Sequence, residues 1–108
     1  MRKMDTVIRK RIGYFGCQYA IYLAENHPNS WEELIEREDM IDILKIIHLH
    51  CQEQMQLYLE IVGKYKLNKH MMNGELPRMI YNRMISEMKD MVFEKCLDLL
   101  AYAEWMVD

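Results

Sequence analysis

Residues 40–67 read MIDILKIIHLHCQEQMQLYLEIVGKYKL and carry the clearest structural pattern in the sequence. Apolar side chains recur in this stretch at intervals of three or four residues, which places them on one face of a helix. That face consists of Leu44, Ile47, Cys51, Met55, Tyr58, Val62 and Tyr65. Further isoleucines and leucines occupy the other faces of the first half. We therefore expect a long helix at the centre of a helical core.

Three more helices are expected around this stretch. Residues 77–106 repeat the apolar spacing and begin with Pro77, which a first helical turn tolerates. An N-terminal helix is expected at about residues 5–25, and a short one at about 31–37, capped by Ser30 and Glu33. Asp39 is the expected N-cap of the helix at 40–67. The expected fold is an all-α bundle, in which a long antiparallel hairpin (about 40–67 and 77–106) is covered by the other two helices.

Composition supports one globular domain, residues 1–108, without a membrane span. The sequence is 51% hydrophobic and 29% charged, with only four glycines and two prolines, too few for the many turns of an all-β fold. No apolar run reaches the length of about 18 residues that a membrane helix needs. Three cysteines, an odd number, are typical of reduced thiols, and no signal peptide is evident. We therefore expect a cytoplasmic protein.

Negative charge is concentrated in the middle of the chain. Residues 25–60 contain nine acidic residues and two basic ones, Arg37 and Lys45. The densest group, here called the acidic surface, comprises Glu32, Glu33, Glu36, Glu38, Asp39 and Asp42. Such a surface predicts docking into the basic groove of a nucleic-acid-handling protein, as small phage and mobile-element inhibitors do by analogy. A divalent-ion site and an ordinary solvated face are the alternatives.

Apolar residues suggest a second contact surface. Eleven methionines are many for 108 residues, and flexible thioethers suit adaptable binding surfaces. The predicted partner-binding methionines are Met71, Met72, Met79, Met84 and Met91. The alternative function is a structural or regulatory homodimer, with a seam of small residues at Gly13, Cys17, Ala20 and Ala24. The same small residues could instead contact another helix of the same chain.

The basic N-terminus gives a third, less favoured function. Nucleic-acid contacts could be made by Arg2, Lys3, Arg9, Lys10 and Arg11. Proteins that bind nucleic acid by charge usually have a basic isoelectric point, whereas that of this chain is about 5.8. The expected partner is therefore another protein with a basic surface.

Neither metal binding nor catalysis is predicted. The one arrangement that could bind zinc would combine Cys17, His48, Cys51 and Cys96, but close cysteine pairs of the C-x-x-C type are absent. Cys51 and Cys96 are expected at the same level of the hairpin, although typical helix spacing argues against a disulfide between them. No nucleophile, phosphate-binding or dinucleotide-binding motif is present, so we expect no enzyme and no cofactor.

Overall fold

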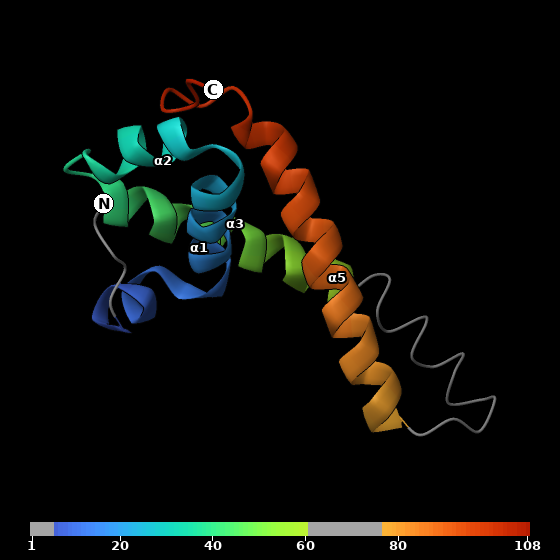
Figure 1. The fold of residues 1–108 in the computed structure, drawn as a ribbon. Coiled ribbons are helices and arrows are strands. Elements are labelled where there is room, and N and C mark those ends of the chain that lie inside the picture. Colours follow the sequence, from blue (N-terminus) through green and yellow to red (C-terminus); the bar gives the residue numbers. More distant parts are fainter. Residues whose placement is uncertain (1–5, 61–76) are drawn as a thin grey trace.

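The computed structural model describes residues 6–60 and 77–108, and all regular structure in these ranges is helical (Figure 1). The helices are α1 (Thr6–Asn26), α2 (Pro28–Ile35), α3 (Met40–Tyr58) and α5 (Pro77–Leu100). They confirm the predicted all-α bundle. The predicted extension of the central helix to residue 67 and the connection that follows it lie outside the described residues. Within the described ranges, no helix combines the length and apolar character required to cross a bilayer.

The core lies mainly between α1 and α3, which share the most extensive helix–helix contact. α2 packs on α1, and α5 packs on α3. Each fully buried leucine of this core contributes on the order of 2 kcal/mol through removal of apolar surface from water. The core residues include Ile12, Phe15, Tyr19, Leu23, Trp31, Leu34, Leu44, Ile47, Cys51, Met88 and Val92. The predicted inward face of α3 is thus confirmed as far as Met55.

Gly13 interrupts α1, which the sequence predicted as one continuous helix. Its backbone angles, φ 76° and ψ 178°, are non-helical and lie in a region that only glycine occupies readily. The chain therefore changes direction at Gly13, and Figure 1 shows the segment before it at an angle to the rest of α1. A Cβ atom at Gly13 would lie 2.4 Å from the ring of His48. This side chain, which comes from α3, occupies the space beside the glycine.

A second glycine permits the close approach of α1 to α3. A Cβ atom at Gly16 would lie 2.7 Å from the main-chain oxygen of Leu44. The two glycines therefore serve contacts within one chain, which was the alternative to a dimer seam for Gly13.

The N-termini of α2 and α3 correct two details of the prediction. α2 begins at Pro28, three residues before the predicted start, so Ser30 lies inside its first turn and is not the cap. A proline at this position is favoured because its φ suits the first turn and its missing N–H has no partner there. Asp39 does precede α3, but its side chain makes no capping hydrogen bond.

The C-terminal segment (residues 101–108) also departs from the prediction. We expected a helix to residue 106, but α5 ends at Leu100 and a series of turns follows. These turns carry the segment over α2 (Figure 1). There the Trp105 indole N–H donates to the Tyr19 hydroxyl at 2.7 Å, and the rings meet edge to face. The segment therefore closes one end of the core.

Candidate functional site

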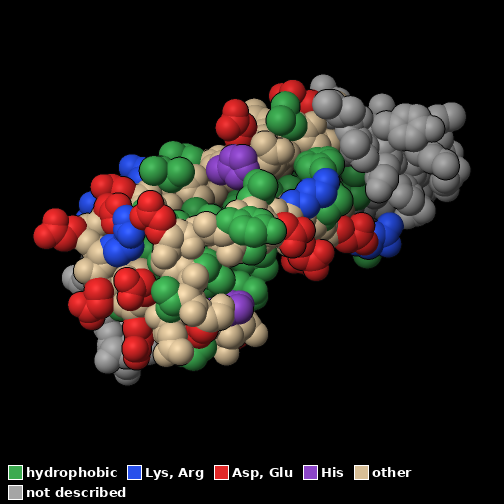
Figure 2. Space-filling view, turned by 90° about the horizontal axis from the view of Figure 1, so that it is seen from above, with side chains coloured by type: hydrophobic (Ala, Val, Ile, Leu, Met, Phe, Trp, Pro, Cys, Tyr) green, Lys and Arg blue, Asp and Glu red, His purple; other side chains and the backbone are tan. Residues whose placement is uncertain are grey.

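The acidic surface lies at the end of the molecule formed by α2 and the start of α3. Helix α2 buries Trp31, Leu34 and Ile35, so its intervening positions face solvent. All six residues of the acidic surface are exposed. Figure 2 shows acidic side chains gathered at this end of the molecule. The structure thus brings the predicted residues together in an accessible position.

Arg37 is the one cation between residues 32 and 42 of the sequence. Its Nε lies 3.0 Å from Asp39 Oδ1, and its Nη1 lies 3.3 Å from Glu104 Oε2. Hydrogen bonding to Arg37 lowers the pKa of the Asp39 carboxyl, and the reciprocal bond raises the pKa of Arg37. The other five carboxylates have no cationic partner within residues 6–60 and 77–108, so the acidic surface stays strongly negative.

A shallow hollow of about 370 Å³ opens within the acidic surface. It is lined by Ile35, Met40 and Ile41 together with the charged residues 36–38. Ile35 and Met40 are almost fully buried and form its floor. An apolar floor beside carboxylates suits a long cationic side chain, whose methylene groups and charged head need different surroundings.

A second concave feature, here called the thiol groove, lies between α3 and α5. It has a volume of about 230 Å³, and Cys51, Cys96, Val92 and Leu99 are among its lining residues. Cys51 and Cys96 line the same groove from opposite helices, which confirms that the two residues stand at the same level. A hydrogen bond between their thiols affects both pKa values. That bond and burial raise the pKa of Cys51, whereas the bond donated by Cys51 lowers the pKa of Cys96.

The predicted methionines do not form one exposed surface among the described residues. Met79 is 68% exposed, whereas Met84 is 7% exposed and belongs with the buried side chains. Met91 is half-buried. Met71 and Met72 lie outside the described residues. Exposed apolar side chains occur instead on α3, where Ile46, Leu49 and Leu57 are about half exposed or more. The expectation that the first half of this helix is buried on all sides is therefore wrong for Ile46 and Leu49.

The small residues of the predicted dimer seam are largely used within the chain. Gly13 faces His48, Ala20 is buried, and Cys17 and Ala24 pack against the core from partly buried positions. The break at Gly13 also removes that residue from the helical stripe on which the seam depended.

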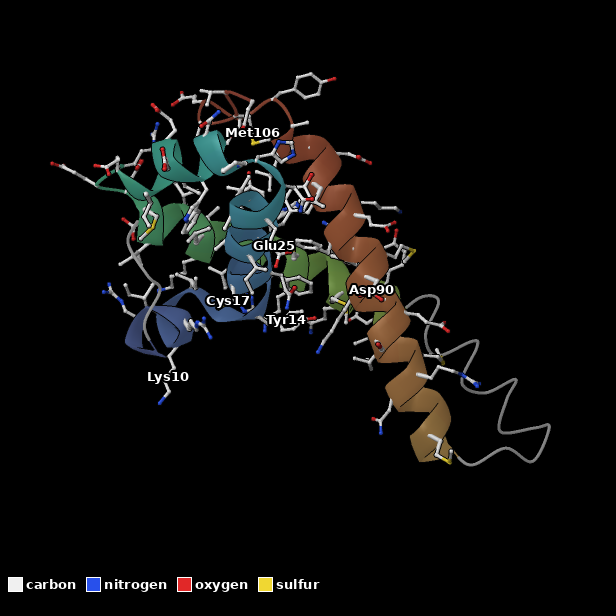
Figure 3. The ribbon with its side chains drawn as sticks, viewed as in Figure 1. Lys10, Tyr14, Cys17, Glu25, Asp90 and Met106 are labelled. Carbon is white, nitrogen blue, oxygen red and sulfur yellow. The ribbon has the colours of Figure 1, made fainter. Side chains whose placement is uncertain are left out.

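The basic residues that the structure describes are accessible. Arg9, Lys10 and Arg11 are all exposed, and they lie before the break in α1. In Figure 3, Lys10 points away from the rest of the molecule. Arg2 and Lys3 lie outside the described residues.

The four residues of the conceivable zinc site do not converge. His48 accepts a hydrogen bond from the Phe15 N–H at 3.2 Å, and the Cys17 thiol donates to the Arg9 carbonyl. Only Cys51 and Cys96 meet. Among the described residues, no group of three or more histidine, cysteine, aspartate or glutamate side chains is arranged to hold a metal ion.

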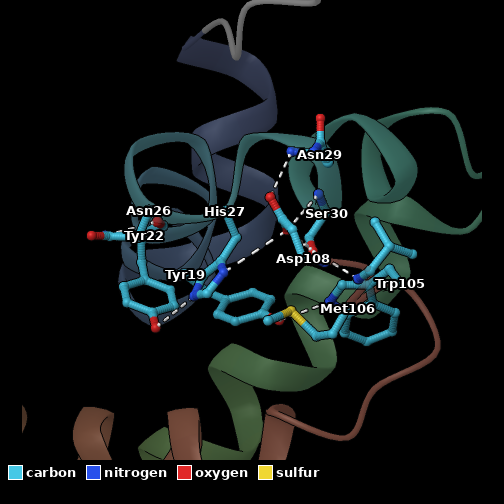
Figure 4. Close-up of polar contacts among 10 residues, drawn as sticks. Tyr19, Tyr22, Asn26, His27, Asn29, Ser30, Trp105, Met106 and Asp108 are labelled. Carbon is cyan, nitrogen blue, oxygen red and sulfur yellow. Dashed lines mark hydrogen bonds and ion pairs between the residues drawn. The ribbon is translucent and has the colours of Figure 1, made fainter.

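A polar network joins α1, α2 and the C-terminal segment (Figure 4). The Asp108 carboxylate accepts hydrogen bonds from the Ser30 hydroxyl and from the main-chain N–H groups of Asn29 and Ser30, both at 3.1 Å. These bonds, that of the hydroxyl first, lower the pKa of Asp108. His27 lies 3.9 Å from the same carboxylate and 3.2 Å from the Tyr22 hydroxyl.

This network contains a serine, a histidine and an aspartate, but its arrangement is structural. In a hydrolytic triad the serine hydroxyl bonds to histidine and faces the substrate. Here Ser30 is fully buried, its hydroxyl donates to Asp108, and it accepts the Val107 N–H at 2.9 Å. Burial likewise raises the pKa of Tyr19 to about 12, which keeps its hydroxyl protonated. The network therefore secures the C-terminal segment on α2. The local sequence pattern gives no signal of this network, because Asp108 lies 78 positions from Ser30.

His48 predicts a pH dependence of stability. Its Nδ1 must be unprotonated to accept the Phe15 N–H, and burial lowers its pKa below the usual 6.5. The unfolded chain therefore binds the proton first as pH falls, and stability declines from about pH 6.5 towards the folded pKa. Urea denaturation of the wild type across pH 5–7 should show this decline. His48→Asn keeps a side-chain acceptor that does not titrate, so its decline should be smaller; an unchanged decline would contradict the assignment.

Comparison of the chain with family models, with curated proteins and with solved structures gives no match. A functional proposal therefore depends on the chemistry of the surfaces described above.

Proposed function

We propose that this chain is a non-catalytic binding protein that docks its acidic surface into a basic groove of another protein. The observation that carries the proposal is the joint exposure of six carboxylates with a single arginine among them, two of which, Glu36 and Glu38, line the hollow. Exposed charges of one sign steer association with a surface of the opposite sign and raise the rate of encounter.

The hollow gives the proposed contact its chemical detail. A lysine or arginine of the partner would lay its methylene groups against Ile35 and Met40 and direct its charged head towards Glu36 or Glu38. Arg37 does not block this contact, because its guanidinium is held by Asp39 and Glu104.

A basic groove of this kind is typical of proteins that bind nucleic acid, since the groove must accommodate phosphates. In this proposal the chain acts as a small inhibitor or regulator that competes with nucleic acid for such a groove. The exposed carboxylates would occupy positions that phosphates otherwise take. We place this function in the cytoplasm, because the three cysteines are free thiols.

Two alternative functions would use other surfaces of the molecule. A homodimer would use apolar surface, and the exposed side chains on α3 favour that surface over the small stripe of α1. Nucleic-acid binding would use Arg9, Lys10 and Arg11, which are exposed. Neither alternative accounts for the acidic surface.

The proposal predicts a local charge dependence of binding. Glu32→Gln/Glu33→Gln/Glu36→Gln removes three exposed charges without adding bulk. The wild-type chain should bind an arginine-rich peptide in calorimetric titration, and its affinity should fall as salt rises. The triple variant should bind about tenfold more weakly, because three surface charges at about 0.5 kcal/mol each amount to about 1.5 kcal/mol.

A matched variant separates the acidic surface from net charge. Glu87→Gln/Asp90→Asn/Glu94→Gln makes the same change in charge on exposed positions of α5. This control should bind the peptide as the wild type does. Equal loss of affinity in both variants would show that only total charge matters and would contradict the proposed site.

A further inference from the structure

The thiol groove contains a nucleophilic pair that the proposed binding function does not use. Cys51 comes from α3 and Cys96 from α5, and both are free thiols that line the same groove. Buried cysteines usually act as small hydrophobic residues. This pair differs because both of its members also line an open groove.

The two sulfurs differ in their access to the groove. Cys51 is fully buried, whereas Cys96 retains 6% exposure. A small molecule entering the groove therefore meets Cys96 first. Cys51 is the more deeply buried residue of the same lining, which is the position of a resolving thiol.

Lys95 contributes a positive charge to the lining of the thiol groove. The Lys95 ammonium is held there by a hydrogen bond to the Tyr58 hydroxyl and lies 5.0 Å from the centre of the Tyr58 ring. His50 and Gln54 add polar groups to the lining. A fixed ammonium in the lining of the groove attracts anionic ligands.

We propose that the thiol groove is a modification site for small anionic disulfides of the glutathione type, at which Cys96 is the attacking thiol and Cys51 the resolving thiol. Cys96 releases its proton to solvent, and its sulfur attacks one sulfur of the small disulfide. A mixed disulfide forms, and the first small thiolate leaves. Cys51 then attacks Cys96 Sγ, its proton passes to the second leaving thiolate, and the Cys51–Cys96 disulfide forms. The protein dithiol is oxidised by two electrons, and the small disulfide is reduced to two thiols.

The direction of attack agrees with the electrostatics of the pair. The pKa of Cys96 is lowered because Cys51 donates a hydrogen bond to it, which increases its thiolate fraction. A covalent S–S bond requires the two sulfurs to move closer, so α3 and α5 must adjust from the typical helix spacing that opposes such a bond. The same exchange runs backwards when a reduced small thiol is in excess, so the modification is reversible.

Oxidation would join α3 to α5 on the two sides of residues 61–76. These helices share a less extensive contact than α1 and α3 do. The bond would therefore stiffen this less extensive contact between α3 and α5. The acidic surface lies on α2 and the start of α3, so this site does not depend on the proposed binding function.

The experiment exposes the reduced full-length chain to glutathione disulfide and follows the products by intact mass and non-reducing peptide mapping. The wild type should lose two hydrogen masses, with Cys51 linked to Cys96. Cys51→Ser should stop at a mixed disulfide on Cys96. Cys96→Ser should leave Cys51 unmodified over the same time. Cys17→Ser is the matched control and should form the Cys51–Cys96 bond at the wild-type rate.

Two outcomes would overturn the proposal. In one, the wild type accumulates a mixed disulfide on Cys17 while Cys51 and Cys96 remain reduced. In the other, Cys96 is modified but the bond to Cys51 does not form. Circular dichroism of each variant verifies that the helices are retained, and Cys51→Ala replaces Cys51→Ser if the serine variant does not fold.

Discussion

Gly13→Ala is expected to lower the free energy of unfolding by about 3 kcal/mol or more. A non-glycine residue forced into the region of φ 76° and ψ 178° costs about 1–3 kcal/mol. The new methyl group would also lie 2.4 Å from the His48 ring. Displacing that ring removes the acceptor of the Phe15 N–H. This N–H lies at the start of the second part of α1, where it has no partner within the helix, so it would be left unpaired. Urea denaturation should show a lower midpoint with an unchanged slope.

A double variant separates backbone strain from the collision. His48→Ala creates room for the methyl group but leaves the backbone angles unchanged. Gly13→Ala should therefore lower the free energy of unfolding by less in the His48→Ala background than in the wild type. The loss that remains measures the backbone strain. The free energy of unfolding of Gly13→Ala could instead lie within about 0.5 kcal/mol of the wild type, which is the typical range for neutral surface changes. That result would show that the break in α1 is not required.

Ser30→Ala is expected to be the second most destabilising of these changes, at about 2–3 kcal/mol. Its hydroxyl is fully buried and donates to a charged carboxylate, Asp108. It also accepts the N–H groups of Val107 at 2.9 Å and Asp108 at 3.3 Å. Alanine leaves these groups without their partner and releases the C-terminal segment from α2.

The measurement is urea denaturation combined with hydrogen exchange of residues 101–108. Their amide protection should fall in Ser30→Ala, while that of α3 should be reduced only in line with global stability. Ser86→Ala is the matched control, since Ser86 is exposed on α5 and should change stability by less than about 0.5 kcal/mol. Unchanged protection of the C-terminal segment would contradict the role assigned to Ser30.

Periodicity was sufficient to predict the helices and the residues that share a face. The buried face of α3 and the meeting of Cys51 with Cys96 both follow from counting turns. The acidic surface could likewise be predicted, because carboxylates seldom leave water and the apolar positions of α2 fix its orientation.

Contacts between distant parts of the chain were beyond such patterns. Gly13 was expected within a continuous helix, and nothing local shows that His48 occupies the space beside it. Ser30 matched a capping sequence so well that the competing signal of Pro28 was overlooked. Trp105 fits a helical stripe, but its partner Tyr19 is 86 residues away, and periodicity does not identify partners. The misses at Gly13 and Trp105 share one cause, since contacts with distant residues decided the local conformation, whereas the start of α2 depends on the local preference of Pro28.

The fastening of the C-terminal segment also has a kinetic consequence. The contacts join Ser30 to Asp108, 78 positions apart, and Tyr19 to Trp105, 86 positions apart. Most helical bundles rely instead on contacts between residues that are close in sequence. Closing such a long loop is entropically costly until α1, α2 and α3 already provide a surface to receive it. The segment should therefore add late during folding and leave early during unfolding. Contacts absent from the transition state slow the loss of the native state, so these eight residues govern the lifetime of the folded molecule more than the speed of its formation.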